Sequence, residues 1–211
     1  MGYIDEKIAL LEREARRQKQ EERLEAQRAA QPPSEKEEIP PMTLEEMLQA
    51  VREGSVTLPD GEKHAFEVRD ALTEQVPMVL IKDIYTGVEE QEAVCIYVDH
   101  DRDISQMLTL ADKPVNEERL GAWKKQLETG MQQAGIYVEV TKEKVLENLD
   151  YLVYRTPTAK GWIYNFIFRL QTGSRRVTGN YNCLEKDKET YGLMLEAVLH
   201  RMNELLSETV R

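Results

Sequence analysis

The stretch GNYNCL, residues 179–184, and the apolar-striped segment that follows from about Lys188 to Leu206 decide the fold of this chain. In the second segment, apolar side chains recur at spacings of three and four residues, which is the period of one helix face. They are Tyr191, Met194, Leu195, Val198, Leu199, Met202, Leu205 and Leu206. So complete a stripe must pack on a large apolar surface. We therefore expect a strand that ends near Leu184 and leads into a helix covering a sheet, with Cys183 packed and unreactive.

Strand-like runs upstream predict that sheet. β-Branched and aromatic residues concentrate in short runs bounded by turn signals. The runs cover residues 64–68, 78–85, 93–98, 136–141, 149–155, 162–170 and 177–182. The segment 86–91 suits a hairpin loop, and short turns between the last four runs indicate an antiparallel meander.

One amphipathic helix interrupts the strands. Asn116 is a plausible N-cap, and Gly135 is a natural stop. Between them, apolar residues at spacings of three and four predict one buried face. They are Leu120, Trp123, Leu127, Met131 and Ala134.

This order of elements predicts an α+β fold, with a mostly antiparallel sheet covered by a middle helix and a long C-terminal helix. We expect residues 43–211 to form this sandwich domain. Its first element is a short helix, residues 43–54, opened by the capping box TLEE. Residues 31–42 read as a proline-rich acidic linker, and residues 1–30 as a charged N-terminal helix.

The N-terminal helix carries a short apolar seam. Ile4, Ile8 and Leu11 follow the spacing of a coiled coil, but polar residues occupy the later seam positions. One interpretation is a solvated helix with a short docking stub. The other is that these three residues contact a partner or a second copy of the chain.

The end of the sequence also resembles a known superfamily. GNYNCL, a short polar break, the aromatic Tyr191 and the long amphipathic helix are similar to the end of the Mog1/PsbP-like superfamily, including its bacterial DcrB-like members. The resemblance covers roughly residues 60–207, although family members often carry Trp where this chain has Tyr191. It implies a non-catalytic scaffold, since members bind a small GTPase, attach to photosystem II, or act as chaperones for secreted bacterial effectors. The chain offers no partner-specific motif to match.

Composition argues against several classes of partner. Of the 211 residues 41% are hydrophobic and 32% charged, and the net charge is −11. Residues 1–33 carry seven acidic and seven basic side chains, so the whole excess lies in residues 34–211. Such a surface repels phosphate backbones, which disfavours nucleic acid. No apolar run approaches about 20 residues, and the N-terminus lacks a secretory apolar region. We expect a cytoplasmic protein without membrane insertion.

Motifs for catalysis, cofactors or metals are not evident. Residues 99–103, DHDRD, have metal-like spacing, but Ile104 and Leu110 occupy the positions where an EF-hand needs Gly and Glu. We therefore expect a strand end with solvated acids. The histidines are scattered, Cys95 and Cys183 read as reduced packing residues, and the eleven glycines form no phosphate loop. We expect no enzyme, no cofactor and no metal.

The aromatic residues of one predicted strand are the best candidate for partner binding. Trp162, Tyr164, Phe166 and Phe168 share one face of a regular strand. They either pack under a helix or form a binding face, because Ile163 and Ile167 make the strand apolar on both sides.

The leading hypothesis is a bacterial adaptor or chaperone that binds another protein. An oligomeric structural protein assembled through the N-terminal helix is the alternative, and an uncharacterised enzyme or metal-binding protein is the third.

Overall fold

The computed structural model describes residues 41–73, 75–111, 119–172 and 175–209, which belong to the unit Pro41–Arg211. The predictions for the N-terminal helix, for most of the linker and for Asn116 lie outside the described residues. The contacts predicted for Ile4, Ile8 and Leu11 therefore stay predictions.

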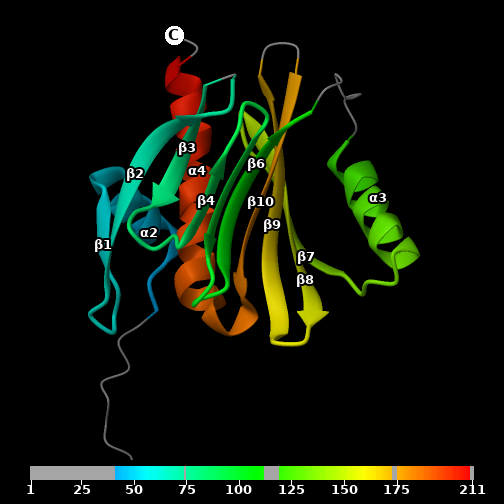
Figure 1. Ribbon diagram of the computed structural model, residues 1–211, viewed down its shortest axis with the longest axis horizontal. Coiled ribbons are helices and arrows are strands. Elements are labelled where there is room, and N and C mark those ends of the chain that lie inside the picture. The colour runs from blue at the N-terminus through cyan, green and yellow to red at the C-terminus, as the bar shows by residue number, and fades with distance from the viewer. Residues whose placement is uncertain (1–40, 74, 112–118, 173–174, 210–211) are drawn as a thin grey trace, which may run out of the picture. The chain divides into compact units, whose positions relative to one another are not determined.

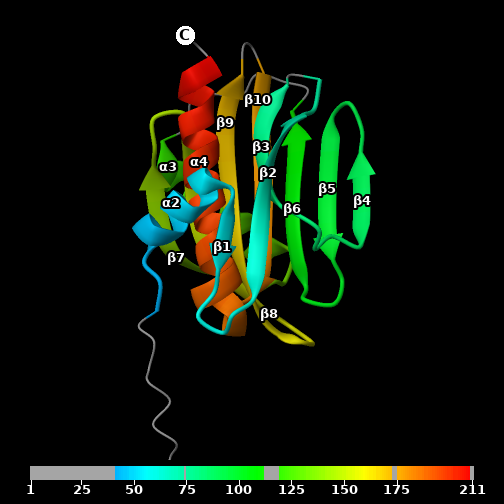
Figure 2. The same cartoon turned by 90° about the vertical axis from the view of Figure 1, so that its left-hand side faces the viewer.

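Among the described residues, the larger of two antiparallel sheets has seven strands in the order β4-β5-β6-β10-β9-β8-β7 (Figure 1 and Figure 2). The strands are β4 (Gly87–Glu90), β5 (Val94–Asp99), β6 (Ile104–Leu110), β7 (Glu139–Val145), β8 (Leu149–Thr158), β9 (Gly161–Thr172) and β10 (Arg175–Leu184). The stretch GNYNCL completes the central strand β10, which pairs with β9 and β6 along its length. It ends at Leu184, as the sequence predicts.

A smaller sheet and a short helix precede the large sheet. The strands β1 (Ser55–Thr57), β2 (Lys63–Ala71) and β3 (Val76–Ile81) form it in that order. The helix α2 (Leu44–Glu53) begins with the predicted capping box at Thr43 and Glu46. It ends at Gly54, whose φ of 85° is left-handed and favours glycine.

The long C-terminal helix α4 (Leu193–Thr209) lies on one face of the large sheet, beside β3 and covered by α2, and it contributes to the core (Figure 2). A 3₁₀ turn η1 (Glu185–Asp187) and a π turn η2 (Lys188–Gly192) connect it to β10. The predicted stripe is confirmed, because five of its members are fully buried: Met194, Leu195, Val198, Leu199 and Met202. Opposite the large sheet, α4 contacts α2 and β3. The predicted α+β class is confirmed.

A side chain closes the edge of the small sheet. Gln106 on β6 is fully buried, and its amide group donates to the carbonyl of Val79 at 2.9 Å and accepts from the Ile81 N–H at 3.4 Å. Tyr85 also donates to the same amide oxygen. Since an unpaired strand edge exposes backbone donors and acceptors, Gln106 takes the place of a neighbouring strand for β3.

The middle helix α3 (Leu120–Gln133) differs from the expectation of a buried face, because none of its residues is fully buried. It contacts β7, and Trp123 stacks against Arg169 with 4.6 Å between the guanidinium carbon and the ring centroid. Arg169 alternates with Phe168 along β9, so α3 contacts the face of the sheet opposite α4. Charged and stacking contacts thus replace the expected apolar burial.

Two strands depart from the prediction. The segment 86–91 was expected to be a hairpin loop, but Gly87–Glu90 forms the edge strand β4 and pairs with β5. The strand β3 ends at Ile81 and belongs to the small sheet, so it makes no hairpin with β5. Asp83, with a φ of 61°, lies in the turn that separates the two sheets. No helix among the described residues is long and apolar enough to cross a membrane.

Candidate functional site

The four predicted aromatic residues share one face of β9, and that face points toward α4. The register pairs Tyr164 with Cys183 and Phe168 with Gly179. Phe166 and Phe168 are fully buried, so they contribute to the core and offer no surface to a partner. Tyr164 is half-buried, and Trp162 is 36% exposed. The accessible part of this set is therefore Trp162 and Tyr164.

Trp162 belongs to an exposed aromatic pair at the end of β9. Tyr137, which is 58% exposed, meets it edge to face with ring centroids 5.8 Å apart. We call Tyr137 and Trp162 the aromatic rim. The guanidinium carbon of Arg155 lies 4.9 Å from the Trp162 ring centroid, a cation–π contact. The rim thus exposes two aromatic rings to solvent in one fixed arrangement, which is typical of interface anchors.

Two carboxylates fix Arg155 in place. Glu139 accepts from its Nε at 3.0 Å and from its Nη2 at 2.9 Å, and Glu185 accepts from its Nη1 at 2.8 Å. These bonds tie β7, β8 and the turn η1 together. Three hydrogen bonds to two carboxylates restrict the guanidinium group to one orientation, so the Trp162 ring lies against a fixed surface.

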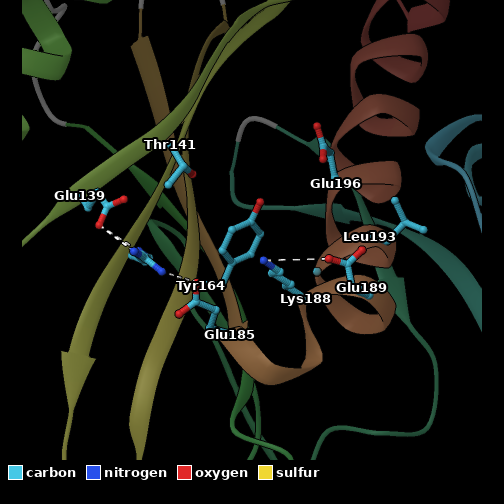
Figure 3. A pocket seen from close by; sticks show the side chains of 10 residues that line it. Glu139, Thr141, Tyr164, Glu185, Lys188, Glu189, Leu193 and Glu196 are labelled. Carbon is cyan, nitrogen blue, oxygen red and sulfur yellow. Dashed lines mark hydrogen bonds and ion pairs between the residues drawn. The ribbon is translucent and has the colours of Figure 1, made fainter. Parts of the chain in front are cut away.

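A pocket of about 420 Å³ opens beside Arg155, between the strands β7 to β9 and the start of α4 (Figure 3). We call it the acidic pocket, because four carboxylates and two basic residues line it. The carboxylates are Glu139, Glu185, Glu189 and Glu196, and the basic residues are Arg155 and Lys188. The π turn η2 forms one wall, so the irregular entry to α4 shapes the pocket.

Glu196 is the buried carboxylate of this pocket, with 7% of its surface exposed. Its Oε1 accepts from the Tyr151 hydroxyl at 2.5 Å and forms an ion pair with Lys142. Its Oε2 has no partner among the described residues. His200 Nε2 lies 3.2 Å from the Tyr151 hydroxyl. Burial, followed by the bond to Glu196, raises the pKa of Tyr151 far above its usual range, so Tyr151 stays a neutral donor.

Tyr164 supplies a phenol to the same pocket. Its ring lies close to the backbone of η2, because a Cβ at Gly192 would be 3.3 Å from Tyr164 Cδ1. Burial and the charge of Glu196 raise the pKa of Tyr164 to about 12. The hydroxyl is therefore neutral at physiological pH, and it has no hydrogen-bond partner within the described part of the chain.

A second pocket of about 480 Å³ is lined by Trp162 and adjoins the acidic pocket, with which it shares Glu185 and Lys188. We call it the basic pocket, since Lys160, Lys186 and Lys188 line it together with a single carboxylate, Glu185. Lys160 pairs with Asp103 at 2.7 Å. On a chain of net charge −11, this concentration of lysines is a local reversal of charge.

The acidic run 99–103 is a structural corner. Asp99 was expected to be solvated, but it is fully buried. Its carboxylate accepts from the backbone N–H groups of Asp101 and Arg102 and from the Arg102 guanidinium at 2.9 Å. Burial opposes ionisation, yet these bonds together lower its pKa. Among the described residues, no group of His, Cys, Asp or Glu is placed to hold a metal ion.

The predicted packing role of the cysteines is confirmed. Cys95 and Cys183 are free and buried. Burial, and to a smaller degree Asp187, raises the pKa of Cys183 to about 12. A thiol with so high a pKa is a poor nucleophile at neutral pH.

A comparison with protein-family models and with curated proteins found no match to this chain. The likeness to the Mog1/PsbP-like superfamily therefore remains a hypothesis.

Proposed function

We propose that this chain is a non-catalytic adaptor or chaperone that binds another protein through the aromatic rim and the two pockets beside it. The single observation that carries the proposal is the exposure of Tyr137 and Trp162, which lie against each other. Burying both rings against a partner removes apolar area from water, and aromatic anchors dominate the energy of protein interfaces.

The flanking pockets support binding more than catalysis. Several ionisable groups of the acidic pocket are engaged in ion pairs, as in the Glu139–Arg155–Glu185 bridge. Tyr164 and Tyr151 have raised pKa values, so neither is suited to act as a base near pH 7. The acidic and basic pockets meet at Glu185 and Lys188, and their opposite charges instead favour one orientation of a charged partner.

The resemblance to the Mog1/PsbP-like superfamily supports the same class of function. Members of that superfamily are protein-binding scaffolds, and its bacterial branch includes chaperones for secreted effectors. We extend that role to this chain as part of the proposal, with a cytoplasmic bacterial partner as the expected ligand.

Affinity capture with the purified chain tests the proposal. Immobilised wild-type protein and Trp162→Ala are incubated with a lysate of the source cells, and retained proteins are quantified by mass spectrometry. Truncating an aromatic anchor typically costs about 2 kcal/mol or more, which weakens binding about thirty-fold. A specific protein should be retained by the wild type and lost from Trp162→Ala.

Val88→Ala provides the matched control, because Val88 is 57% exposed and lies on the distant edge strand β4. Thermal unfolding establishes that both variants remain folded. Equal retention by Trp162→Ala and Val88→Ala would contradict the proposal, as would the absence of any specifically retained protein.

The alternative, an oligomer assembled through Ile4, Ile8 and Leu11, follows from the sequence alone. Deleting residues 1–31 and measuring the mass by light scattering separates the two functions. If the deletion leaves the number of chains per particle unchanged, the oligomeric alternative is removed and the adaptor proposal stays intact.

A further inference from the structure

We propose that the acidic pocket receives a lysine or arginine side chain of the protein partner. This inference rests on the proposed function and names the chemistry of one contact at the same site. The cationic group would enter between Tyr164 and the start of α4 and bind the free oxygen of Glu196.

The unpartnered oxygen of Glu196 is the first argument. The side chain is more than nine-tenths buried, and both of its protein donors, Tyr151 and Lys142, contact Oε1. Oε2 has no donor from the described residues, although Glu196 lines the pocket. Oε2 is thus accessible to solvent from the pocket, so a cation that enters can donate a charge-assisted hydrogen bond to it without displacing Tyr151 or Lys142.

The charge of the lining is the second argument. Four carboxylates face two basic groups, and Arg155 is already held between Glu139 and Glu185. Lys188 lies 4.0 Å from Glu189, and that contact is solvent-exposed and weak. Lys142 pairs with Glu196 from outside the lining, so four carboxylates face three basic groups in all, and the single excess negative charge favours a cation inside the pocket.

Tyr164 gives the third argument. Its raised pKa keeps the phenol protonated, and its oxygen can accept a hydrogen bond while its ring offers an apolar wall. Lysine and arginine side chains combine an apolar stem with a charged end. A pocket with an apolar wall and a carboxylate at its buried end matches that combination.

The spacing of the carboxylates argues against a metal ion as the occupant. No three acidic, histidine or cysteine side chains in the described ranges converge on one point. An ammonium or guanidinium group needs only one carboxylate and one further acceptor. The exposed aromatic rim beside the pocket points to a macromolecular source for this group, because a free amine would leave the rim unused.

Calorimetric titration with model compounds tests the inference. The probes are N-acetyl-lysine methylamide, its uncharged analogue N-acetyl-norleucine methylamide, N-acetyl-arginine methylamide and free cadaverine. We expect the lysine or arginine compound to bind at least tenfold more tightly than the norleucine compound. Cadaverine should bind more weakly than the better of the two, because it lacks the peptide groups.

Glu196→Gln is the decisive variant, since it keeps the shape and removes the charge. Binding of the cationic compound should weaken at least fivefold in Glu196→Gln. Tyr164→Phe, which keeps the ring, should weaken it by a smaller factor. Glu143→Gln is the control, because Glu143 pairs with Lys124 outside the pocket. Thermal unfolding verifies that each variant is folded. If Glu196→Gln does not fold, Tyr164→Phe tests the pocket in its place.

Three outcomes overturn the inference: equal binding of the norleucine compound, unchanged binding by folded Glu196→Gln and Tyr164→Phe, or cadaverine binding as tightly as the peptide-like probes. These results are separable from the test of the proposed function. If capture depends on Trp162 but the cationic probes do not bind, only the inference fails. If the probes bind but capture is independent of Trp162, only the proposed function fails.

Discussion

Gly179 on β10 lies directly beneath the ring of Phe168 on β9. The two residues are paired in the antiparallel register, and a Cβ at position 179 would lie only 2.0 Å from Phe168 Cζ. Tyr181 meets the same ring edge to face at 4.8 Å. The glycine of GNYNCL is therefore required by close packing in the middle of a strand, where glycine is otherwise unfavourable.

Replacing Gly179 by alanine should destabilise the fold strongly. The added methyl group cannot be accommodated without moving Phe168, which is fully buried. Overpacking of this kind costs roughly 1–3 kcal/mol and occasionally more, and we expect the upper end. Urea denaturation measures the loss. Gly121→Ala on α3 is the control, since no atom lies near its Cβ, and it should leave stability unchanged or slightly higher. Equal stability of the two variants would contradict this account.

Replacing Gln106 by leucine should also destabilise the chain, although leucine is apolar and the site is buried. The change removes the partners of the Val79 carbonyl and the Ile81 N–H. Each unsatisfied buried group costs about 1–3 kcal/mol. Chemical denaturation should show this loss for Gln106→Leu and almost none for exposed Gln133→Leu on α3. A neutral Gln106→Leu would mean that β3 does not need this cap.

Stability should fall as the pH drops below the ordinary histidine pKa of about 6.5. Burial lowers the pKa of both His64 and His200, outweighing the charges of Glu62 near the first and Glu196 near the second. Because the unfolded chain then binds protons more readily than the folded one, the folded state loses stability as the pH falls. Carboxylates titrate lower, so the window from pH 7.5 to 5.5 isolates the histidines.

Urea denaturation at the two pH values measures this effect. The double variant His64→Phe, His200→Gln should lose less stability than the wild type between pH 7.5 and 5.5. Phenylalanine preserves the ring contact with Tyr191, whose centroid lies 5.5 Å away. His100→Gln, at an exposed position, serves as the control. The histidine account is wrong if the wild type and the double variant have the same pH dependence.

Both cysteines should resist thiol reagents in the folded protein. Cys183 is fully buried, and its pKa of about 12 leaves almost no thiolate at pH 8. Cys95 is 4% exposed. Labelling with a chromogenic disulfide should therefore proceed only as fast as the protein opens, and addition of urea should accelerate it steeply. Rapid labelling of the native chain would show that the large sheet opens easily around β5 or β10.

The sequence predicts the last helix and its strand well because their signals are local. The stripe of α4 repeats over several turns, and the capping box at Thr43 satisfies its own backbone groups. The strand β6 was missed because its alternation is blurred. Its buried face contains the polar Gln106, and its opposite face contains the apolar Met107. The alternation of apolar and polar residues fails at Gln106, because a polar side chain is buried there to bond with β3.

Half of the candidate site could be predicted. Trp162 and Tyr164 stand out as aromatic residues of one strand face, but their burial depends on where α4 begins to cover that face. Tyr137 comes from a segment distant in the chain, and only folding brings it to Trp162. Glu196 stands out in the sequence only as a charged residue inside an apolar run. Its role depends on Tyr151 and Lys142, which the fold brings to it from β8 and β7.

The position of α4 has a consequence for biosynthesis. It follows every described strand in the chain, yet it completes a core whose strands are all made before it. Until residues 193–209 have left the ribosome, α4 cannot cover the apolar faces of β3, β8, β9 and β10. The hydrophobic core is therefore completed only when the last helix docks. A nascent chain that stalls before this helix exposes apolar strand faces that can aggregate.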